Sequence, residues 1–246
     1  MQVMRIGTLR RGRAQESGPG VTGVVRLDRR TKTLTKRLRP GDIAVIDHVD
    51  IDRVSADALV SCKVAAVVTH LEMTERPVRR SDPPGSWTLR KVDAPELAWY
   101  RDLFRRVGEE WLWFSRARMN DAELAAVIHA PGIEVYALVA DGRDEGLLEL
   151  DFRESGQCEL VYFGVTASLI GTGAARFLMN RALELVWSRE LRRVWVHTCT
   201  LDHPSAVAFY QRSGFRPFRR QIEIADDPRL DGTASRDAAR HVPIIE

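Results

Sequence analysis

The sequence predicts an α/β (α+β) protein whose main body begins near Trp87, and three observations carry this prediction. From Trp87 onward, strand-like and helix-like patterns follow one another in the order β-α-α-β-β-β-α-β-α-β. The turns DGRDEG and ESGQ join three successive strand patterns in the manner of hairpins. Residues 162–180, YFGVTASLIGTGAARFLMN, then set a glycine turn between a strand and a helix. These patterns predict a sheet flanked by helices.

The first elements of this body are a strand and two helices. WTLRKV, residues 87–92, has the composition of a strand. Residues 95–107, PELAWYRDLFRRV, place their apolar side chains on one face at helical spacing. Asn120 followed by Glu123 is typical of a helix start, so a second helix is predicted over residues 122–130.

The remaining elements alternate between strands and helices. In chain order we expect strands over 134–140, 146–153 and 159–165, a long helix after Gly173, a strand over 192–199, a helix over 205–213, and two short strands over 215–220 and 221–224.

A smaller β-α-β unit is predicted ahead of this body. It consists of strands over 20–27 and 42–48, a helix over 52–62 and a strand over 64–69. The stretch that follows is polar, rich in Pro and Arg, and interrupted by Pro83-Pro84-Gly85, which favours neither helix nor sheet. We therefore expect three parts: an N-terminal fragment over 1–69, a linker over 70–86, and a main domain over 87–246.

The composition is that of an ordinary soluble globular protein. Of the 246 residues, 44% are hydrophobic and 29% are charged. No apolar run approaches the roughly 18–20 residues that a membrane-spanning helix needs, and no apolar segment follows the basic N-terminus as in a secretory signal. Cys62, Cys158 and Cys199 lack metal-ligand spacing, and so sparse a count fits a reducing cytoplasm. A cytoplasmic protein without a metal is expected.

The charge is unevenly distributed along the chain. The net charge is +3, but residues 1–80 carry an excess of Lys and Arg, whereas the rest carries an excess of Asp and Glu. A basic segment of this kind can contact nucleic acid or acidic lipid. Its arginines are scattered and lack interleaved aromatic residues, however. A solvated face is therefore favoured, and neither a nucleic-acid partner nor a membrane is expected.

The glycine turn at residues 170–175, IGTGAA, allows three interpretations. A dinucleotide-binding fingerprint needs a third glycine, but Arg176 stands in its place. A Walker A loop needs Gly-Lys-Ser/Thr, which is absent. What remains is a compact turn that presents backbone N–H groups at a helix N-terminus, where a diphosphate binds well. On the glycines alone, a simple tight turn is an equally good explanation.

Two motifs together resemble those of the GCN5-related N-acetyltransferase (GNAT) family. The pattern Gln/Arg-x-x-Gly-x-Gly/Ala maps onto Ile170-x-x-Gly173-x-Ala175, and AFYQRSGF resembles the aromatic-rich helix that follows the next strand. The order of elements matches over residues 87–224. The resemblance implies the acyl-CoA N-acyltransferase fold, a mixed and mostly antiparallel central sheet flanked by helices. Two departures are Ile170, in place of Gln or Arg, and TLDHPSA, where the family often has an asparagine.

The resemblance also implies the ligand and several roles. Acetyl-CoA is the implied cosubstrate, with no metal, and the acceptor is an amine of a small molecule or a protein. Tyr210 matches the tyrosine that protonates the CoA thiolate, although it would equally suit a core position beside Phe209. The amide of Val165, or that of Phe163, is the expected oxyanion donor. The implied cofactor-binding residues are Phe163, Gly164, Val165, Ile170, Gly171, Thr172, Gly173, Ala174 and Ala175.

The general base is open between two carboxylates. Glu159 begins the cofactor-binding strand, where the family often places a carboxylate. Glu149 lies on the preceding strand, two residues from Asp151 and on the same side. Each could instead be solvated or ion-paired. His197 is a candidate proton relay, although a histidine in an alternating strand also suits a structural role.

The stretch EEWLWFSRARM lies where the first helices of this fold cover the acceptor site. We expect Trp113, Phe114 and Arg116 to contact the acceptor, unless the aromatic residues belong to the core. An arginine there would favour an acceptor that carries a carboxylate.

Residues 21–69 resemble the beginning of the actinobacterial SteA-like family, which is related to thiamin pyrophosphokinases. The resemblance stops near Thr69, and the rest of that family's sequence is absent. A fusion of two genes is one explanation, and no activity is carried over.

The sequence therefore predicts an N-acetyltransferase that transfers an acetyl group from acetyl-CoA by direct attack of an amine in a ternary complex. The alternative is a catalytically weak module that senses acyl-CoA and is fused to a basic partner-binding segment. A homodimer is compatible with either interpretation.

Overall fold

The computed structural model of the protein describes residues 4–5, 25–28, 43–46 and 66–244. The chain divides into two compact units. Unit 1 holds residues 1–68, 220–227 and 243–246; unit 2 holds residues 69–219 and 228–242. No helix within the described residues has the length and the apolar character that crossing a bilayer requires.

Unit 1 contains short strands. β1 (Met4–Arg5) pairs antiparallel with the end of β10, and Met4 lies opposite Ile224. β2 (Val25–Asp28) and β3 (Ile43–Ile46) form a two-stranded parallel sheet. Both strands fall within segments that the sequence predicts as strands. The helix expected over 52–62 lies outside the described residues.

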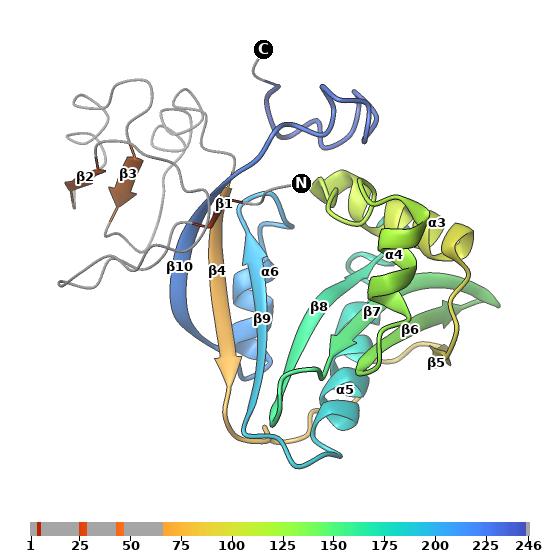
Figure 1. The fold of residues 1–246 in the computed structure, drawn as a ribbon. Coiled ribbons are helices and arrows are strands. Elements are labelled where there is room, and N and C mark those ends of the chain that lie inside the picture. The colour runs from red at the N-terminus through yellow and green to blue at the C-terminus, as the bar shows by residue number, and fades with distance from the viewer. Residues whose placement is uncertain (1–3, 6–24, 29–42, 47–65, 245–246) are drawn as a thin grey trace. The chain divides into compact units, whose positions relative to one another are not determined.

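Unit 2 is built on a seven-stranded sheet of order β10-β4-β9-β8-β7-β6-β5 (Figure 1). Its strands are β4 (Ala66–Met73), β5 (Trp87–Val92), β6 (Ile133–Ala140), β7 (Arg143–Asp151), β8 (Gln157–Val165), β9 (Arg193–Cys199) and β10 (Arg216–Ile224). Neighbours from β5 to β8 are antiparallel, whereas β8 and β9 are parallel. The predicted mixed, mostly antiparallel sheet is confirmed.

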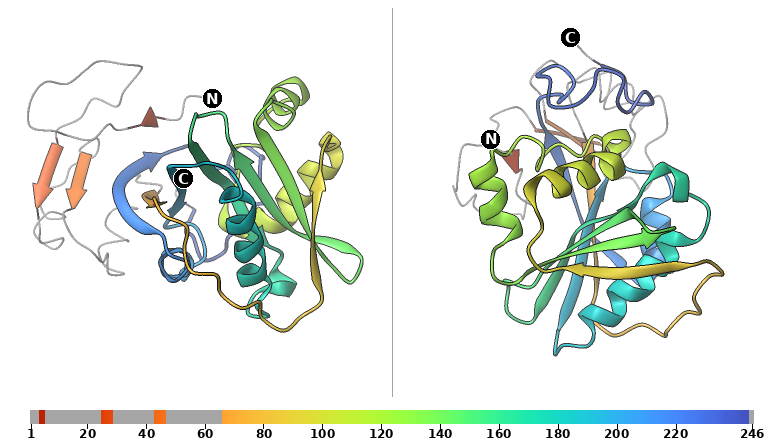
Figure 2. Two further views of the ribbon diagram at one scale, coloured as in Figure 1. Left: turned by 90° about the horizontal axis from the view of Figure 1, so that it is seen from below. Right: turned by 90° about the vertical axis from the view of Figure 1, so that its right-hand side faces the viewer.

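Helices cover both faces of this sheet (Figure 2). α3 (Leu97–Gly108) and α4 (Asp121–Ile128) pack on one face, and α5 (Ala174–Val186) and α6 (Ala206–Arg212) pack on the other. Two short 3-10 turns, η1 (Glu109–Trp111) and η2 (Ala167–Leu169), follow α3 and β8. Each face therefore has its own apolar core, and the sheet lies between them.

The local sequence accounts for the helices next to the site. The α3 side chains at Tyr100, Leu103 and Val107 recur at helical spacing and are buried. α4 begins with the predicted capping box, in which Asn120 and Glu123 each accept a hydrogen bond from the other's backbone N–H at 2.9 Å.

β4 extends into residues that the sequence assigns to a linker. The strand continues to Met73, and the side chains of Leu71 and Met73 are buried in the core under α5 and α6. The reason is that alternation with His70 and Glu72 gives the strand one apolar face, which reads as a polar segment when the sheet is unknown.

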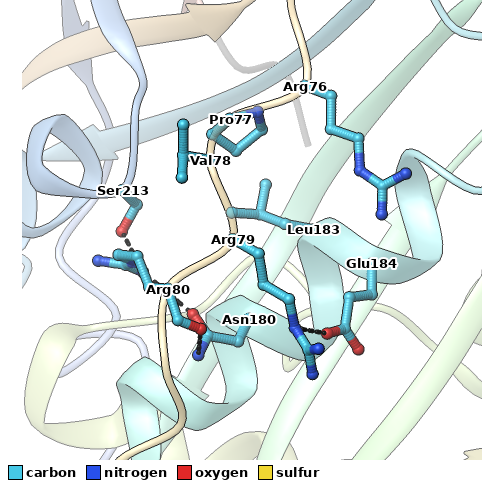
Figure 3. A pocket seen from close by; sticks show the side chains of 9 residues that line it. All are labelled: Arg76, Pro77, Val78, Arg79, Arg80, Asn180, Leu183, Glu184 and Ser213. Carbon is cyan, nitrogen blue, oxygen red and sulfur yellow. Dashed lines mark hydrogen bonds and ion pairs between the residues drawn. The ribbon is translucent and has the colours of Figure 1, made fainter.

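Residues 74–86, which we call the strap, connect β4 to β5 and lie along α5 (Figure 3). Asp82 accepts hydrogen bonds from Asn180 at 2.8 Å and from Arg181 at 2.9 Å. Pro83 lies so close to Gly173 that a Cβ there would be 2.9 Å away. A second correction concerns the two strands expected after Phe215, which form one continuous strand, β10.

Candidate active site

β8 and β9 part along their length. Their parallel pairing runs from Gln157 opposite Arg193 to Leu160 opposite Val196, and ends there. Both strands continue, to Val165 and Cys199, and Figure 1 shows them diverging toward these ends. An opening inside a sheet leaves backbone groups of two strands available to a ligand.

A β-bulge lies at the point where the strands part. On the β7 side, Leu150 is opposite Leu160 and the next residue, Glu149, is opposite Tyr162. Val161 is therefore the extra residue of β8. A bulge bends its strand and increases its twist, which accounts for the separation of β8 from β9 beyond Leu160.

Two backbone amides of β8 point away from β7. Thr166 donates its backbone N–H to the Glu145 carbonyl of β7 at 2.9 Å. Because amide directions alternate along a strand, the N–H of Gly164 also faces β7, whereas those of Phe163 and Val165 face the opposite side. That side is the opening between β8 and β9.

The glycine turn follows directly and ends at the N-terminus of α5. Gly171 and Gly173 have φ of +81° and +101°, in the left-handed region that glycine adopts without strain. A Cβ at Gly171 would have no atom within 4 Å, so the turn is open on that side. Within the described residues, no hydrogen bond is found for the amides of Gly171, Gly173 and Ala175. Such a turn can accept an anion.

Tyr210 lies at the same opening, on the face that α5 and α6 cover. It is 7% exposed, and its ring centroid is 6.0 Å from that of Phe163. Its hydroxyl makes no hydrogen bond to the residues that the structure describes. Burial, and then the charge of Asp202, raise the pKa of Tyr210, so the phenol is protonated at neutral pH.

Asp202 joins the far sides of the opening. It accepts hydrogen bonds from the Thr198 hydroxyl at 2.7 Å and the Cys199 amide at 2.9 Å, both at the end of β9. The Trp113 indole N–H also donates to it at 3.3 Å. Asp202 stands in the segment where the resemblance leads one to look for an asparagine, and sequence reasoning assigned it no role.

The two candidate bases have different surroundings. Glu159 is half-buried, and its Oε1 lies 3.0 Å from Nδ1 of His197, which is 41% exposed. The structure thus brings together the base and the relay that the sequence names separately. Glu159 also lies one residue before the end of the β8–β9 pairing.

Glu149, in contrast, is fully buried. It accepts a hydrogen bond from the Tyr100 hydroxyl, and its carboxylate lies 2.7 Å from Nη2 of Arg116. Burial alone would lower the pKa of Arg116, but the charge of Glu149 outweighs it and the pKa is raised. Burial and the same carboxylate raise the pKa of Tyr100. This group is a closed ion pair.

Comparisons with known proteins decide the family. The sequence profile of the acetyltransferase (GNAT) family matches residues 80–215, more than half of the chain. The chain belongs to the GNAT family. A comparison with curated proteins found no match.

Solved structures of this family share the fold. A GCN5-related N-acetyltransferase from Sphaerobacter thermophilus is 16% identical, with a TM-score of 0.52; the match covers 69% of this chain and 55% of the other. One from Kribbella flavida is 16% identical over 72% and 65%, with a TM-score of 0.44. An aminoglycoside acetyltransferase from an uncultured soil metagenomic sample is 20% identical over 55% and 94%, with a TM-score of 0.45. Membership in GNAT gives the class of reaction, acyl transfer. The resemblance of residues 21–69 to the SteA-like family stays a prediction.

Of the three residues expected over the acceptor site of this GNAT domain, Trp113 lies against β8. A Cβ at Gly164 would be 3.1 Å from its ring, and its centroid is 5.0 Å from that of Tyr162. Phe114 instead lies under the Arg118 guanidinium, 4.6 Å from the ring centroid. Arg116 is engaged by the buried carboxylate described above.

A pocket of about 160 Å³ lies behind Trp113, between α3 and the segment that follows it. Its lining residues are Tyr100, Arg101, Phe104, Arg105, Glu109, Leu112, Trp113, Arg116, Ala117, Thr233 and Ala234. The last two belong to the C-terminal segment 228–242, which packs on Leu112. Sequence reasoning missed this contribution, because irregular segments carry no periodicity.

Proposed function

We propose that this GNAT-family chain is an N-acetyltransferase that moves an acetyl group from acetyl-CoA to an amine by direct attack. One observation supports it most. The divergence of β8 from β9 collects three elements at one opening: the outward amides of Phe163 and Val165, the glycine turn, and Tyr210.

The residues at the opening fit CoA. The pyrophosphate suits the unpartnered amides of Gly171, Gly173 and Ala175 at the start of α5. Ile170 is 44% exposed and supplies no polar side chain, so binding here depends on the backbone. The other residues proposed for the cofactor are Gly164, Thr172 and Ala174. The pantetheine arm takes the place that β9 leaves beside β8.

The reaction needs one proton to leave and one to arrive. The amine nitrogen forms a bond to the thioester carbonyl carbon, and the carbon–sulfur bond then breaks. We assign the amides of Phe163 and Val165 to the charge that develops on the carbonyl oxygen. Tyr210 donates a proton to the departing thiolate.

Glu159 is the better candidate for the base that accepts the amine proton. It is partly exposed and touches His197, which reaches solvent and can pass the proton on. Glu149 would first have to break its ion pair with Arg116, and separating a buried pair costs about 3–5 kcal/mol. The same pair neutralises Arg116, so we no longer assign that side chain to an acceptor carboxylate.

The acceptor remains an amine of a small molecule or a protein. Trp113 and Phe114 are proposed to border it, since Trp113 covers β8 beside Gly164. The alternative is a module that binds acyl-CoA but transfers its acyl group poorly. The contact that favours it is the charge of Asp202 near Tyr210, because a raised phenol pKa opposes proton release.

The experiment is to measure thiol release from acetyl-CoA with a panel of amines. Wild type should turn over at least one amine, and Tyr210→Phe and Glu159→Gln should each reduce kcat about 10²–10⁴-fold. Tyr136→Phe is the matched control, since this buried tyrosine donates to Glu134 on the same strand. Binding of acetyl-CoA without turnover of any amine would favour the sensing module.

A further inference from the structure

Three arginine side chains near the strap have no carboxylate partner among the described residues: Arg80, Arg176 and Arg212. Arg80 is held by neutral acceptors only (Figure 3). Its guanidinium donates to the Ser213 hydroxyl at 3.1 Å, the Arg212 carbonyl at 3.3 Å and the Asn180 side-chain oxygen at 3.5 Å.

The three charges face one another. Arg176 and Asn180 are four residues apart on α5 and so lie on one face of the helix, and Asn180 contacts Arg80. Arg212 ends α6, and its carbonyl receives the Arg80 guanidinium. Burial, then Arg176 and Arg212, lower the pKa of Arg80, as expected where positive charges gather.

The nearest carboxylates are committed elsewhere. Asp82 is paired with Arg181 at 2.9 Å, and Glu184 is paired with Arg79 at 3.1 Å and with Arg181 at 3.1 Å. The repulsion among the three arginines is therefore not relieved within this part of the protein. A multiply charged anion would relieve it.

The cluster borders the turn proposed for the pyrophosphate. Arg176 lies in the first turn of α5, directly after Gly173 and Ala175. Pro83 of the strap touches Gly173, three residues beyond Arg80. A ligand whose diphosphate occupies the turn can therefore bring a second phosphate group to the arginines.

We propose that Arg80, Arg176 and Arg212 form a second phosphate site, which binds the 3′-phosphate of the CoA ribose. This inference rests on the proposed function. A phosphate monoester carries about −1.5 to −2 charges at pH 7. Guanidinium groups bind it through paired hydrogen bonds, so three of them match its charge and its oxygens.

The test compares the Kd of CoA with that of 3′-dephospho-CoA by calorimetry. Wild type should bind the dephospho form about tenfold or more weakly, as expected for the loss of hydrogen bonds to a charged group. Arg212→Ala and Arg80→Ala should bring the ratio of the two Kd values close to one and leave the Kd of dephospho-CoA unchanged. Arg79→Ala, an exposed strap arginine paired with Glu184, should keep the wild-type ratio.

The outcomes separate the two proposals. If wild type binds both forms equally, the phosphate site is wrong while CoA binding stands. If neither form binds, the proposed function itself fails. Should the ratio be one while inorganic phosphate raises the Tm of wild type but not of Arg212→Ala, the site serves another phosphorylated ligand and the assignment to CoA is overturned. Arg212 is exposed, so its variant tests the site even if Arg80→Ala does not fold.

Discussion

Leu71→Ala tests whether β4 is an integral part of the GNAT domain, although it precedes the family match at residues 80–215. β4 lies between β9 and β10 in the sheet, and Leu71 is fully buried in the core under α5 and α6. The substitution removes buried methyl and methylene groups and leaves a cavity, and such changes cost about 2–5 kcal/mol.

We expect a loss of about 3 kcal/mol in the free energy of unfolding. For a protein of this size, each kcal/mol lowers the Tm by about 2–4 °C, so a decrease of roughly 6–12 °C follows. Urea unfolding should show a lower midpoint with an unchanged slope, because the surface exposed on unfolding is nearly the same.

Val78→Ala is the matched control, since Val78 lies in the strap and is 90% exposed. Its cost should stay within about 0.5 kcal/mol, as for other surface substitutions. If Leu71→Ala cost no more than Val78→Ala, the assignment of β4 to the core of the domain would be refuted.

Three further predictions concern the site. Gly164→Ala would place a Cβ 3.1 Å from the Trp113 ring, so we expect about 1–3 kcal/mol of destabilisation in urea unfolding and weaker acetyl-CoA binding; unchanged values would contradict the packing. Glu149→Gln leaves Arg116 buried without its carboxylate and should cost about 3–5 kcal/mol, whereas Glu149→Gln with Arg116→Met should cost less than the single change, as measured by a double-mutant cycle. Because the pKa of Tyr210 is raised above its unfolded value of about 10, the stability that this provides is present below pH 10 and is lost as pH rises further. Unfolding measured between pH 8 and 11 should therefore fall less steeply in Tyr210→Phe, and parallel curves would contradict the shift.

The sequence predicts the local elements well because their signals are local. The capping box of Asn120 and Glu123 sets the start of α4, and the turn around Gly173 sets the start of α5. The place of β4 in the sheet depends on pairing with strands more than a hundred residues away, which no local pattern encodes. Its polar residues, His70 and Glu72, made that segment look like a linker.

The site was predictable in part for the same reason. Tyr210 and the glycine turn belong to motifs and were named from the sequence. The role of Glu149 was not, since its partner Arg116 lies 33 residues away and meets it only in the folded chain. Asp202 was likewise missed, because its link to Trp113 spans 89 residues.

A crystal structure with CoA tests the account most directly. We predict that the pantetheine arm lies between β8 and β9, with hydrogen bonds from the amides of Phe163 and Val165, and that the pyrophosphate lies on the turn around Gly173. CoA bound elsewhere on the molecule, or β8 and β9 paired beyond Leu160 in the complex, would contradict it.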